Sequence, residues 1–317
     1  MRIVGPEDLD RHLAFPALVA ALRGAFLGGF HAPTRHHHHV GTGDGPGPVH
    51  LLMPAWSADA PRPGAYVGTK IVDVFPDNGR LGLPAVMGVY VLQSGETGAP
   101  LAVLDGTRLT HWRTAAVSAL GADLLARPGA ARLLVVGAGA LAPFLARAHA
   151  AVRPLAHVAV WNHRPAGAER LAAGLRDAGL PADAVTDLEG AVRGADIVCC
   201  ATLSTAPLIR GAWLQAGQHL DLVGAFTMGM READDEALRR ARVVVDTAAA
   251  LTEGGDVAIA IRDGVLRPEA VVDLGALCRA EAPGRGGPDD ITLFKPVGTA
   301  VADLATAILA WEAVSAA

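Results

Sequence analysis

The two lysines of this 317-residue chain, Lys70 and Lys295, are its first candidates for chemistry, since the other 25 basic residues are arginines. Arginine can replace lysine wherever a solvated charge is enough, but it cannot deprotonate or fit as a compact point charge. Lys70 follows Gly68-Thr69 in a β-rich run, where a catalytic amine is the favoured interpretation. For Lys295, a catalytic amine and a strand lysine whose amine reaches the surface are both open interpretations.

A glycine-rich turn in the middle of the chain is typical of dinucleotide binding. The apolar run 133–136 leads into Gly137-Ala138-Gly139-Ala140-Leu141-Ala142, which matches Gly-x-Gly-x-x-Ala. The first glycine makes a tight turn, the second lets a pyrophosphate approach the backbone, and the small third residue lets helix and strand pack closely. The helix N-terminus adds free N–H groups for the phosphate. We expect cofactor contacts from Gly137, Gly139, Ala140 and Ala142.

The end of the next predicted strand indicates which dinucleotide is bound. An NAD site usually places an acid there to bind the ribose 2′-hydroxyl, and that acid would repel a 2′-phosphate. Here Asn162 stands at the strand end, and Arg164 follows it. Arginine can bind a phosphate bidentately, although Arg164 also fits an ordinary exposed arginine. The pair favours NADPH as the cofactor, with NADH as the alternative.

Two arginines are candidates for binding a substrate carboxylate. Arg113 is predicted to start a helix at the junction between two domains, and Arg35 lies just before a histidine run. The planar guanidinium matches a carboxylate in a two-point contact. A structural salt bridge is an equally good interpretation of each from spacing alone.

The histidine run, His36–His39, suggests a metal site at first sight. Adjacent side chains on a strand point to opposite faces, so at most two of the four could share an ion. No third or fourth ligand is evident from the sequence, so we expect no metal site here. One of these histidines could instead line a pocket.

Two kinds of pattern must position these residues. The first 30 residues predict a strand and a helix over Pro16–Phe26, and residues 32–112 predict short strands separated by turn clusters, as in an antiparallel sheet. From Thr114 onward, helices alternate with continuous apolar strands, which predicts a doubly wound parallel sheet. A last helix, Ala300–Ala317, follows a break at Pro296 and could return to the first domain. The expected fold class is therefore α/β, with a Rossmann-type sheet and a mostly antiparallel β domain.

Composition excludes several classes of function. The net charge of −5 gives no basic field for nucleic acid or an anionic membrane. We see no signal-peptide core and no apolar stretch of membrane-spanning length. The three cysteines lack metal-site spacing, which favours reduced thiols in a cytoplasmic protein.

Taken in order along the chain, the motifs resemble the ornithine cyclodeaminase/μ-crystallin family. They are Gly68-Thr69-Lys70-Ile71-Val72, Gly82-Leu83-Pro84-Ala85, Asp105-Gly106-Thr107-Arg108-Leu109-Thr110, Arg113-Thr114-Ala115-Ala116, the glycine turn, Ala195-Asp196-Ile197-Val198, Gly224-Ala225 and Thr292-Leu293-Phe294-Lys295. The resemblance implies a substrate-binding and dimerising domain over 1–112 plus 300–317, a Rossmann domain over 113–299, and a homodimer. It adds Thr202, Gly224, Ala225 and Arg113 to the cofactor contacts, and Lys70 and Val297 to the substrate contacts. Pro296 stands where the family commonly has serine, which puts the contact near Val297 in doubt.

Departures from the family pattern bear on the reaction. Ornithine cyclodeaminases carry acids at the positions of Phe226 and Leu51, and apolar residues cannot shuttle protons. The segment 221–234 looks like the bacterial pyrroline-2-carboxylate reductase branch. We therefore expect NAD(P)H-dependent reduction of a cyclic α-imino acid to proline or pipecolate, with Arg35 and Arg113 binding the carboxylate and Lys70 supplying a proton. The alternatives are an ornithine cyclodeaminase, an alanine-dehydrogenase-like enzyme and a μ-crystallin-like binding protein.

Overall fold

The computed structural model describes residues 1–41 and 47–317, which form two compact units. Unit 1 comprises Met1–Arg113 and Thr299–Ala317, and unit 2 comprises Thr114–Gly298. The predicted domain bounds differ from these by one residue at each junction.

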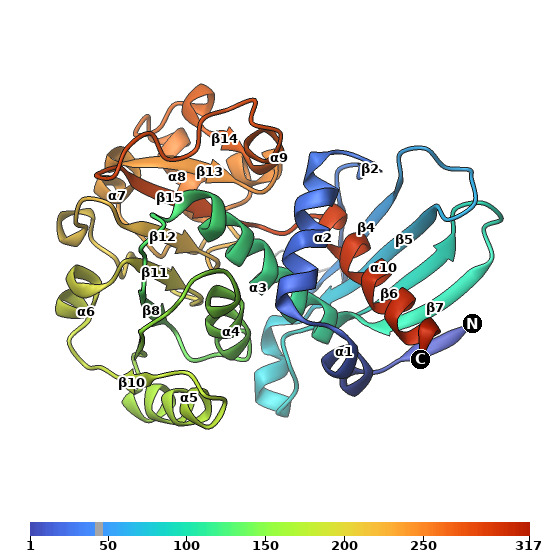
Figure 1. Ribbon diagram of the computed structural model, residues 1–317, viewed down its shortest axis with the longest axis horizontal. Helices are drawn as coiled ribbons and strands as arrows, with labels where there is room; N and C mark the ends of the chain where they lie inside the picture. Colours follow the sequence, from blue (N-terminus) through green and yellow to red (C-terminus); the bar gives the residue numbers. More distant parts are fainter. Residues whose placement is uncertain (42–46) are drawn as a thin grey trace. The chain divides into compact units, whose positions relative to one another are not determined.

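Unit 1 is a largely antiparallel sheet with helices packed on one face (Figure 1). Its strand order is β1-β7-β6-β5-β4-β2, with β3 paired to β4, and β1 pairs with β7 in parallel. The strands are β1 (Arg2–Val4), β2 (Phe30–His31), β3 (His36–His39), β4 (Val49–Ser57), β5 (Tyr66–Val74), β6 (Val86–Ser94) and β7 (Pro100–Asp105). The helices are α1 (Pro6–His12), α2 (Phe15–Leu27) and α10 (Ala300–Ala316), with a 3-10 turn over Pro76–Leu81.

The two faces of this sheet differ in burial, as the period-2 alternation of strand side chains requires. On β5, Gly68, Lys70 and Val72 are buried, whereas Thr69 and Ile71 between them are partly exposed. Helix α10 contacts β4, β5 and β6 on one side and α2 on the other, which explains its almost wholly apolar sequence. Lys70 therefore points toward the helices, into the core of unit 1.

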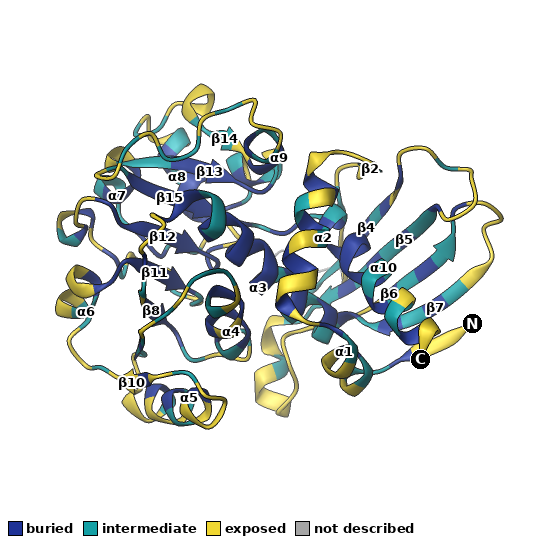
Figure 2. Cartoon of the chain, in the orientation of Figure 1, coloured by how far each residue is buried: buried dark blue, intermediate teal, exposed yellow. Residues whose placement is uncertain are grey.

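Unit 2 is a parallel sheet in the order β10-β9-β8-β11-β12-β15-β13-β14. Figure 2 shows its central strands buried, as the continuous apolar sequences predict. The strands are β8 (Arg132–Val136), β9 (His157–Trp161), β10 (Ala182–Ala184), β11 (Ile197–Cys200), β12 (His219–Leu222), β13 (Ala241–Val245), β14 (Val272–Asp273) and β15 (Ile291–Lys295). The helices are α3 (Gly106–Leu125, which begins in unit 1), α4 (Ala142–Val152), α5 (Pro165–Asp177), α6 (Leu188–Gly194), α7 (Asp235–Arg240), α8 (Gly255–Arg262) and α9 (Leu274–Cys278), with 3-10 turns at Gly211–Trp213, Ala248–Leu251 and Pro268–Ala270.

This topology confirms the predicted doubly wound sheet. Strands β9 and β10 lie on one side of β8, and β11 and β12 lie on the other, so the strand order reverses at β8. The glycine turn that follows β8 therefore lies at this reversal point. Strand β15, which the alternation of elements did not predict, is inserted between β12 and β13. Among the residues that the structure describes, no helix combines the length and hydrophobicity needed to cross a bilayer.

The prediction that Arg113 starts a helix is wrong. Helix α3 begins at Gly106, so Arg113 lies well inside it. Leu109, Trp112 and Ala116 are buried at helical spacing, and this pattern extends the helix toward its N-terminus.

Candidate active site

Three charged side chains meet in the core of unit 1: Lys70 on β5, Arg113 on α3 and Asp303 on α10. The Lys70 Nζ lies 2.8 Å from each carboxylate oxygen of Asp303. The Arg113 Nε lies 3.0 Å from Asp303 Oδ1, although its N–H is not aligned for a hydrogen bond, so this contact is an ion pair. Lys70 is 2% exposed and Asp303 is fully buried. One carboxylate therefore neutralises two cations in part, which leaves the cluster with a net positive charge suited to an anionic ligand.

The environment of Lys70 lowers the pKa of its amine to about 8, mainly because burial disfavours the charged form. The positive charge of Arg113 lowers the pKa further, and so does that of half-buried Arg35. The ion pair and hydrogen bond with Asp303 act in the opposite direction. An amine of this pKa is mostly protonated near neutrality yet gives up its proton readily, as a general acid requires.

Tyr90 lies directly opposite Lys70 across the β5–β6 pair. It is fully buried, and its hydroxyl has no hydrogen-bond partner among the residues that the structure describes. Burial and the nearby charge of Asp303 raise the pKa of Tyr90 well above its usual value, so the hydroxyl stays protonated and able to donate. Its position also explains Gly68, because a Cβ at residue 68 would overlap the Tyr90 hydroxyl.

Sequence reasoning missed Asp303 and Tyr90. Asp303 is one of two charged residues in α10, and a charge inside so apolar a helix was an available signal. It could equally be read as an acid favoured by the helix N-terminus. Nothing in the sequence marks Tyr90, since its importance depends on which residue of β5 it faces.

The glycine turn of unit 2 fits a dinucleotide phosphate. Gly137 has φ 107°, and a Cβ there would lie 2.6 Å from the Ala201 carbonyl oxygen, so the turn itself requires glycine. A Cβ at Gly139 would meet no protein atom within 4 Å. This open space is where the motif brings a pyrophosphate to the backbone. Ala142 is the first residue of α4, whose N-cap has no side-chain hydrogen bond, which suits phosphate binding by backbone N–H groups.

The two residues after β9 occupy different environments. The Asn162 side-chain amide donates to the Arg164 carbonyl oxygen at 3.0 Å, so it shapes the turn that leads into α5. Arg164 is the N-cap residue of α5 and is exposed. No acidic residue stands at residues 162–164, so nothing there repels a 2′-phosphate.

A buried acid joins two of the other predicted cofactor residues. The Glu232 carboxylate accepts from the Thr202 backbone N–H at 2.7 Å and from its hydroxyl at 2.8 Å. A Cβ at Gly224 would overlap both Glu232 and the Thr202 carbonyl oxygen, so only glycine fits between them. Burial raises the pKa of Glu232 to about 7. Glu232 was not predicted from the sequence, and it connects the loops after β11 and β12.

Lys295 has a structural position in unit 2. It is fully buried, which makes the interpretation of a strand lysine with its amine at the surface wrong. Its amine donates to the carbonyl oxygens of Leu222, at 2.8 Å, and Gly224, and lies 3.8 Å from Asp256. Lys295 therefore stabilises the end of β12, at the loop that begins with Gly224.

The remaining predicted contacts lie in loops of unit 2. Ala225 has φ 49°, and Phe226 after it is 40% exposed, so an apolar ring stands where cyclodeaminases carry an acid. The Asp246 carboxylate accepts from the backbone N–H groups of Val297, at 3.0 Å, and Gly298, at 2.7 Å. The Val297 backbone N–H is therefore already bound within the protein.

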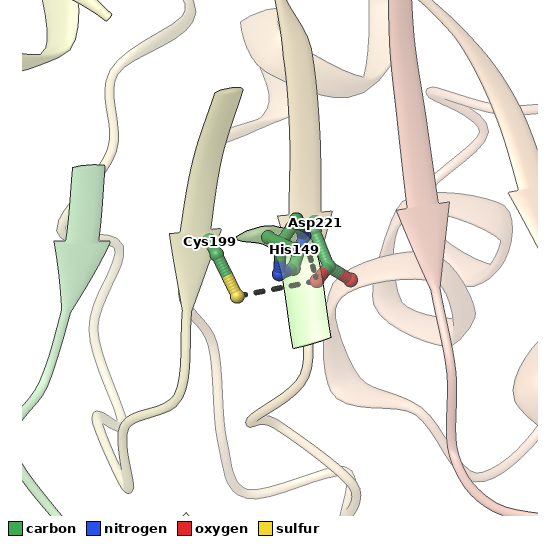
Figure 3. A group of neighbouring side chains, drawn as sticks. All are labelled: His149, Cys199 and Asp221. Atoms are coloured by element: carbon green, nitrogen blue, oxygen red, sulfur yellow. Dashed lines mark hydrogen bonds and ion pairs between the residues drawn. The ribbon is translucent and has the colours of Figure 1, made fainter. Parts of the chain in front are cut away.

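A second polar cluster, formed by His149, Cys199 and Asp221, lies in the core of unit 2 (Figure 3). The Cys199 thiol donates to Asp221 at 3.2 Å, and the His149 Nε2 lies 3.7 Å from the same carboxylate oxygen. Burial raises the pKa values of Cys199 and Asp221 and lowers that of His149, so it favours the uncharged form of all three. We interpret the cluster as part of the hydrogen-bonded core, because a metal site would require a thiolate and a carboxylate.

Known proteins resemble the chain over its whole length. The Delta(1)-pyrroline-2-carboxylate reductase of Colwellia psychrerythraea is 35% identical over 316 residues, which cover 97% of this chain and 97% of the relative. The structure of the Thermococcus litoralis reductase of the same name, in complex with NADH and L-proline, has a TM-score of 0.92 and 30% identity and covers 100% of this chain and 98% of that chain. An archaeal alanine dehydrogenase dimer with bound NAD has a TM-score of 0.90 and 29% identity, with coverages of 100% and 96%. Because the family profile matches residues 5–317, the chain belongs to the ornithine cyclodeaminase/mu-crystallin family.

Proposed function

We propose that the protein is an NAD(P)H-dependent reductase that converts a cyclic α-imino acid, pyrroline-2-carboxylate or piperideine-2-carboxylate, into L-proline or L-pipecolate. The observation that carries this proposal is the buried amine of Lys70, which Asp303 holds and whose pKa is about 8. Reduction of an imine needs one proton at nitrogen and one hydride at carbon. An amine of this pKa is matched to the first requirement at neutral pH.

The charges of unit 1 account for the rest of the proposed chemistry. Arg35 and Arg113 bind the substrate carboxylate, and Lys70 protonates the imine nitrogen. Asp303 holds the Lys70 amine in place, since both of its oxygens lie 2.8 Å from Nζ. When bound, the reduced nicotinamide supplies the hydride. Fixing the carboxylate and the nitrogen at the same time orients the imine carbon, and orientation contributes much of the acceleration in such reactions.

Phe226 and Leu51 favour a reductase over an ornithine cyclodeaminase. A cyclodeaminase must release ammonia and close a ring, which requires proton transfers that apolar side chains cannot perform. The same cluster around Lys70 would serve an alanine-dehydrogenase-like reaction, so pyruvate with ammonia is the necessary comparison substrate.

The preferred cofactor is NADPH. The similar solved structures contain NADH or NAD, so the preference for NADPH over NADH rests on residues 162–164 of the present chain. Asn162 carries no charge, and the exposed guanidinium of Arg164 is available to a 2′-phosphate.

The functional unit is a homodimer in which a second copy packs on the apolar part of the sheet face of unit 1 that points away from the helices. Large apolar side chains are exposed on this face, among them Ile3, Trp56 and Val89. An uncovered apolar sheet face of this kind is typical of an interaction surface. A monomeric mass in solution would contradict this assembly.

The experiment that tests the reaction is NADPH oxidation by the purified protein with five- and six-membered cyclic imino acids. Ornithine with catalytic NAD, and pyruvate with ammonia, serve as comparison substrates. We expect turnover of at least one cyclic imino acid and no ammonia release from ornithine. Faster turnover of pyruvate, or ammonia release at a comparable rate, would exclude the imine reductase; binding without turnover of any substrate would indicate a binding protein.

A further inference from the structure

Four side chains from three neighbouring strands form a row on the sheet of unit 1. His38 on β3 pairs with His50 on β4, and His50 pairs with Asp73 on β5. His36 lies two residues before His38 and therefore on the same face. This face points away from the helices. On β4, Met53 is buried beneath the helices, and His50, three residues before it, lies on the opposite face because side chains alternate along a strand. We call His36, His38, His50 and Asp73 the histidine ladder.

The side chains of the ladder lie next to one another. The ring centroids are 6.3 Å apart for His36 and His38 and 6.4 Å apart for His38 and His50. The His50 Nδ1 lies 2.8 Å from Asp73 Oδ1. An ionised carboxylate only accepts hydrogen bonds, so the proton of the neutral ring stays on Nδ1, and Nε2 keeps its lone pair. This is the carboxylate–histidine arrangement that orients imidazole ligands in metal sites.

We propose that the histidine ladder binds one divalent transition-metal ion, Zn²⁺ in the first instance. His36, His38 and His50 are the ligands, and Asp73 orients His50. Imidazole nitrogen suits zinc, and three such ligands leave a position for water. The sequence alone predicted no site here, because the third ligand comes from another strand.

Assembly of the site requires the three histidine rings to move toward one another. With Zn–N distances of about 2.0–2.1 Å, imidazole rings sharing one ion have centroids about 5 Å apart. The separations of two of the three ring pairs, His36–His38 and His38–His50, exceed this by about 1 Å. His36 and His38 are exposed and His50 is partly exposed, so their rings can rotate without disturbing the core.

The same histidine run provides the control. His37 and His39 have the same residue type and lie on the same exposed strand, but on its other face. They pair with Leu51 and Val49, so their strand partners offer no third ligand. A double substitution there removes two imidazoles and leaves the ladder complete.

The test is isothermal titration of ZnCl₂ into the metal-free, full-length protein, with native mass spectrometry reporting both the ions bound per chain and the oligomeric state. We compare the unmodified chain with His36→Ala/His38→Ala, His50→Ala, Asp73→Asn and the control His37→Ala/His39→Ala. NADPH binding and melting temperature confirm that each variant is folded.

We expect one Zn²⁺ per chain. The His36→Ala/His38→Ala and His50→Ala variants should lose at least about tenfold in affinity, and Asp73→Asn about tenfold, as for lost metal-orienting partners. The control should stay within about twofold of the unmodified chain, as expected for substitutions away from a metal's ligand shells. Absence of zinc binding, or an equal loss in the control, would overturn the proposal, and neither result bears on the reductase reaction.

Discussion

Replacing Lys70 by arginine tests whether its amine transfers a proton. Arginine keeps the positive charge and can still pair with the buried Asp303 carboxylate, but it loses a compact and titratable amine. The larger group must also fit where Lys70 is 2% exposed, and such overpacking costs about 1–3 kcal/mol. We therefore expect a folded protein with a modestly lower melting temperature and nearly unchanged NADPH affinity.

The expected loss of activity follows from the two acidities. The pKa of Lys70 is about 8, whereas arginine remains protonated to above about 12. With the proton about half transferred in the transition state, an acid weaker by about four pKa units donates about a hundredfold more slowly. A hundredfold loss in turnover corresponds to about 2.7 kcal/mol of transition-state stabilisation.

The assay is single-turnover NADPH oxidation with a saturating cyclic imino acid. NADPH affinity and thermal unfolding are measured on the same sample. The expected result is a separation, in which cofactor affinity and folding persist while the chemical step fails. Near-normal turnover of Lys70→Arg would show that Lys70 acts only as a positive charge in the cluster with Arg113 and Asp303. If the variant does not fold, Lys70 has a structural role, and the inference that a rare lysine marks a catalytic amine is refuted.

Three further predictions concern pH, the cofactor and the second lysine. Because Lys70 acts in its protonated form, kcat/KM for imine reduction should fall as pH rises through about 8, and this fall should be absent in Lys70→Arg; an identical profile in both would remove the assignment. Arg164→Ala should weaken NADPH binding by about tenfold or more, as for a lost charged hydrogen bond, and leave NADH binding nearly unchanged; equal losses would show that Arg164 does not read the phosphate. Lys295→Met leaves Asp256 and Glu232 buried without their cation, so the free energy of unfolding in urea should fall by about 3–5 kcal/mol, whereas a stable but inactive variant would contradict a structural role.

Features that depend on neighbours along the chain were predictable. The glycine turn, the strand that precedes it and the helix that follows it are set by local patterns, and the structure places Gly137 where only glycine fits. Lys70 stood out in the sequence as one of two lysines, in a β-rich run, whereas its burial depends on which alternate positions of β5 face the core. The resemblance to the family was likewise recognisable from the motifs, and the family profile that matches residues 5–317 confirms it.

Contacts that depend on register and on helix placement were decided only by the tertiary structure. Asp303 lies 233 residues after Lys70, and no local pattern relates the two. His50 joins the histidine ladder, and Tyr90 faces Lys70, through strand pairing, where a one-residue slip would turn each side chain to the other face of the sheet. A sequence records which residues alternate along one strand. The strands and helices that pack beside it determine which charges share a buried space, and that sharing sets the pKa of Lys70.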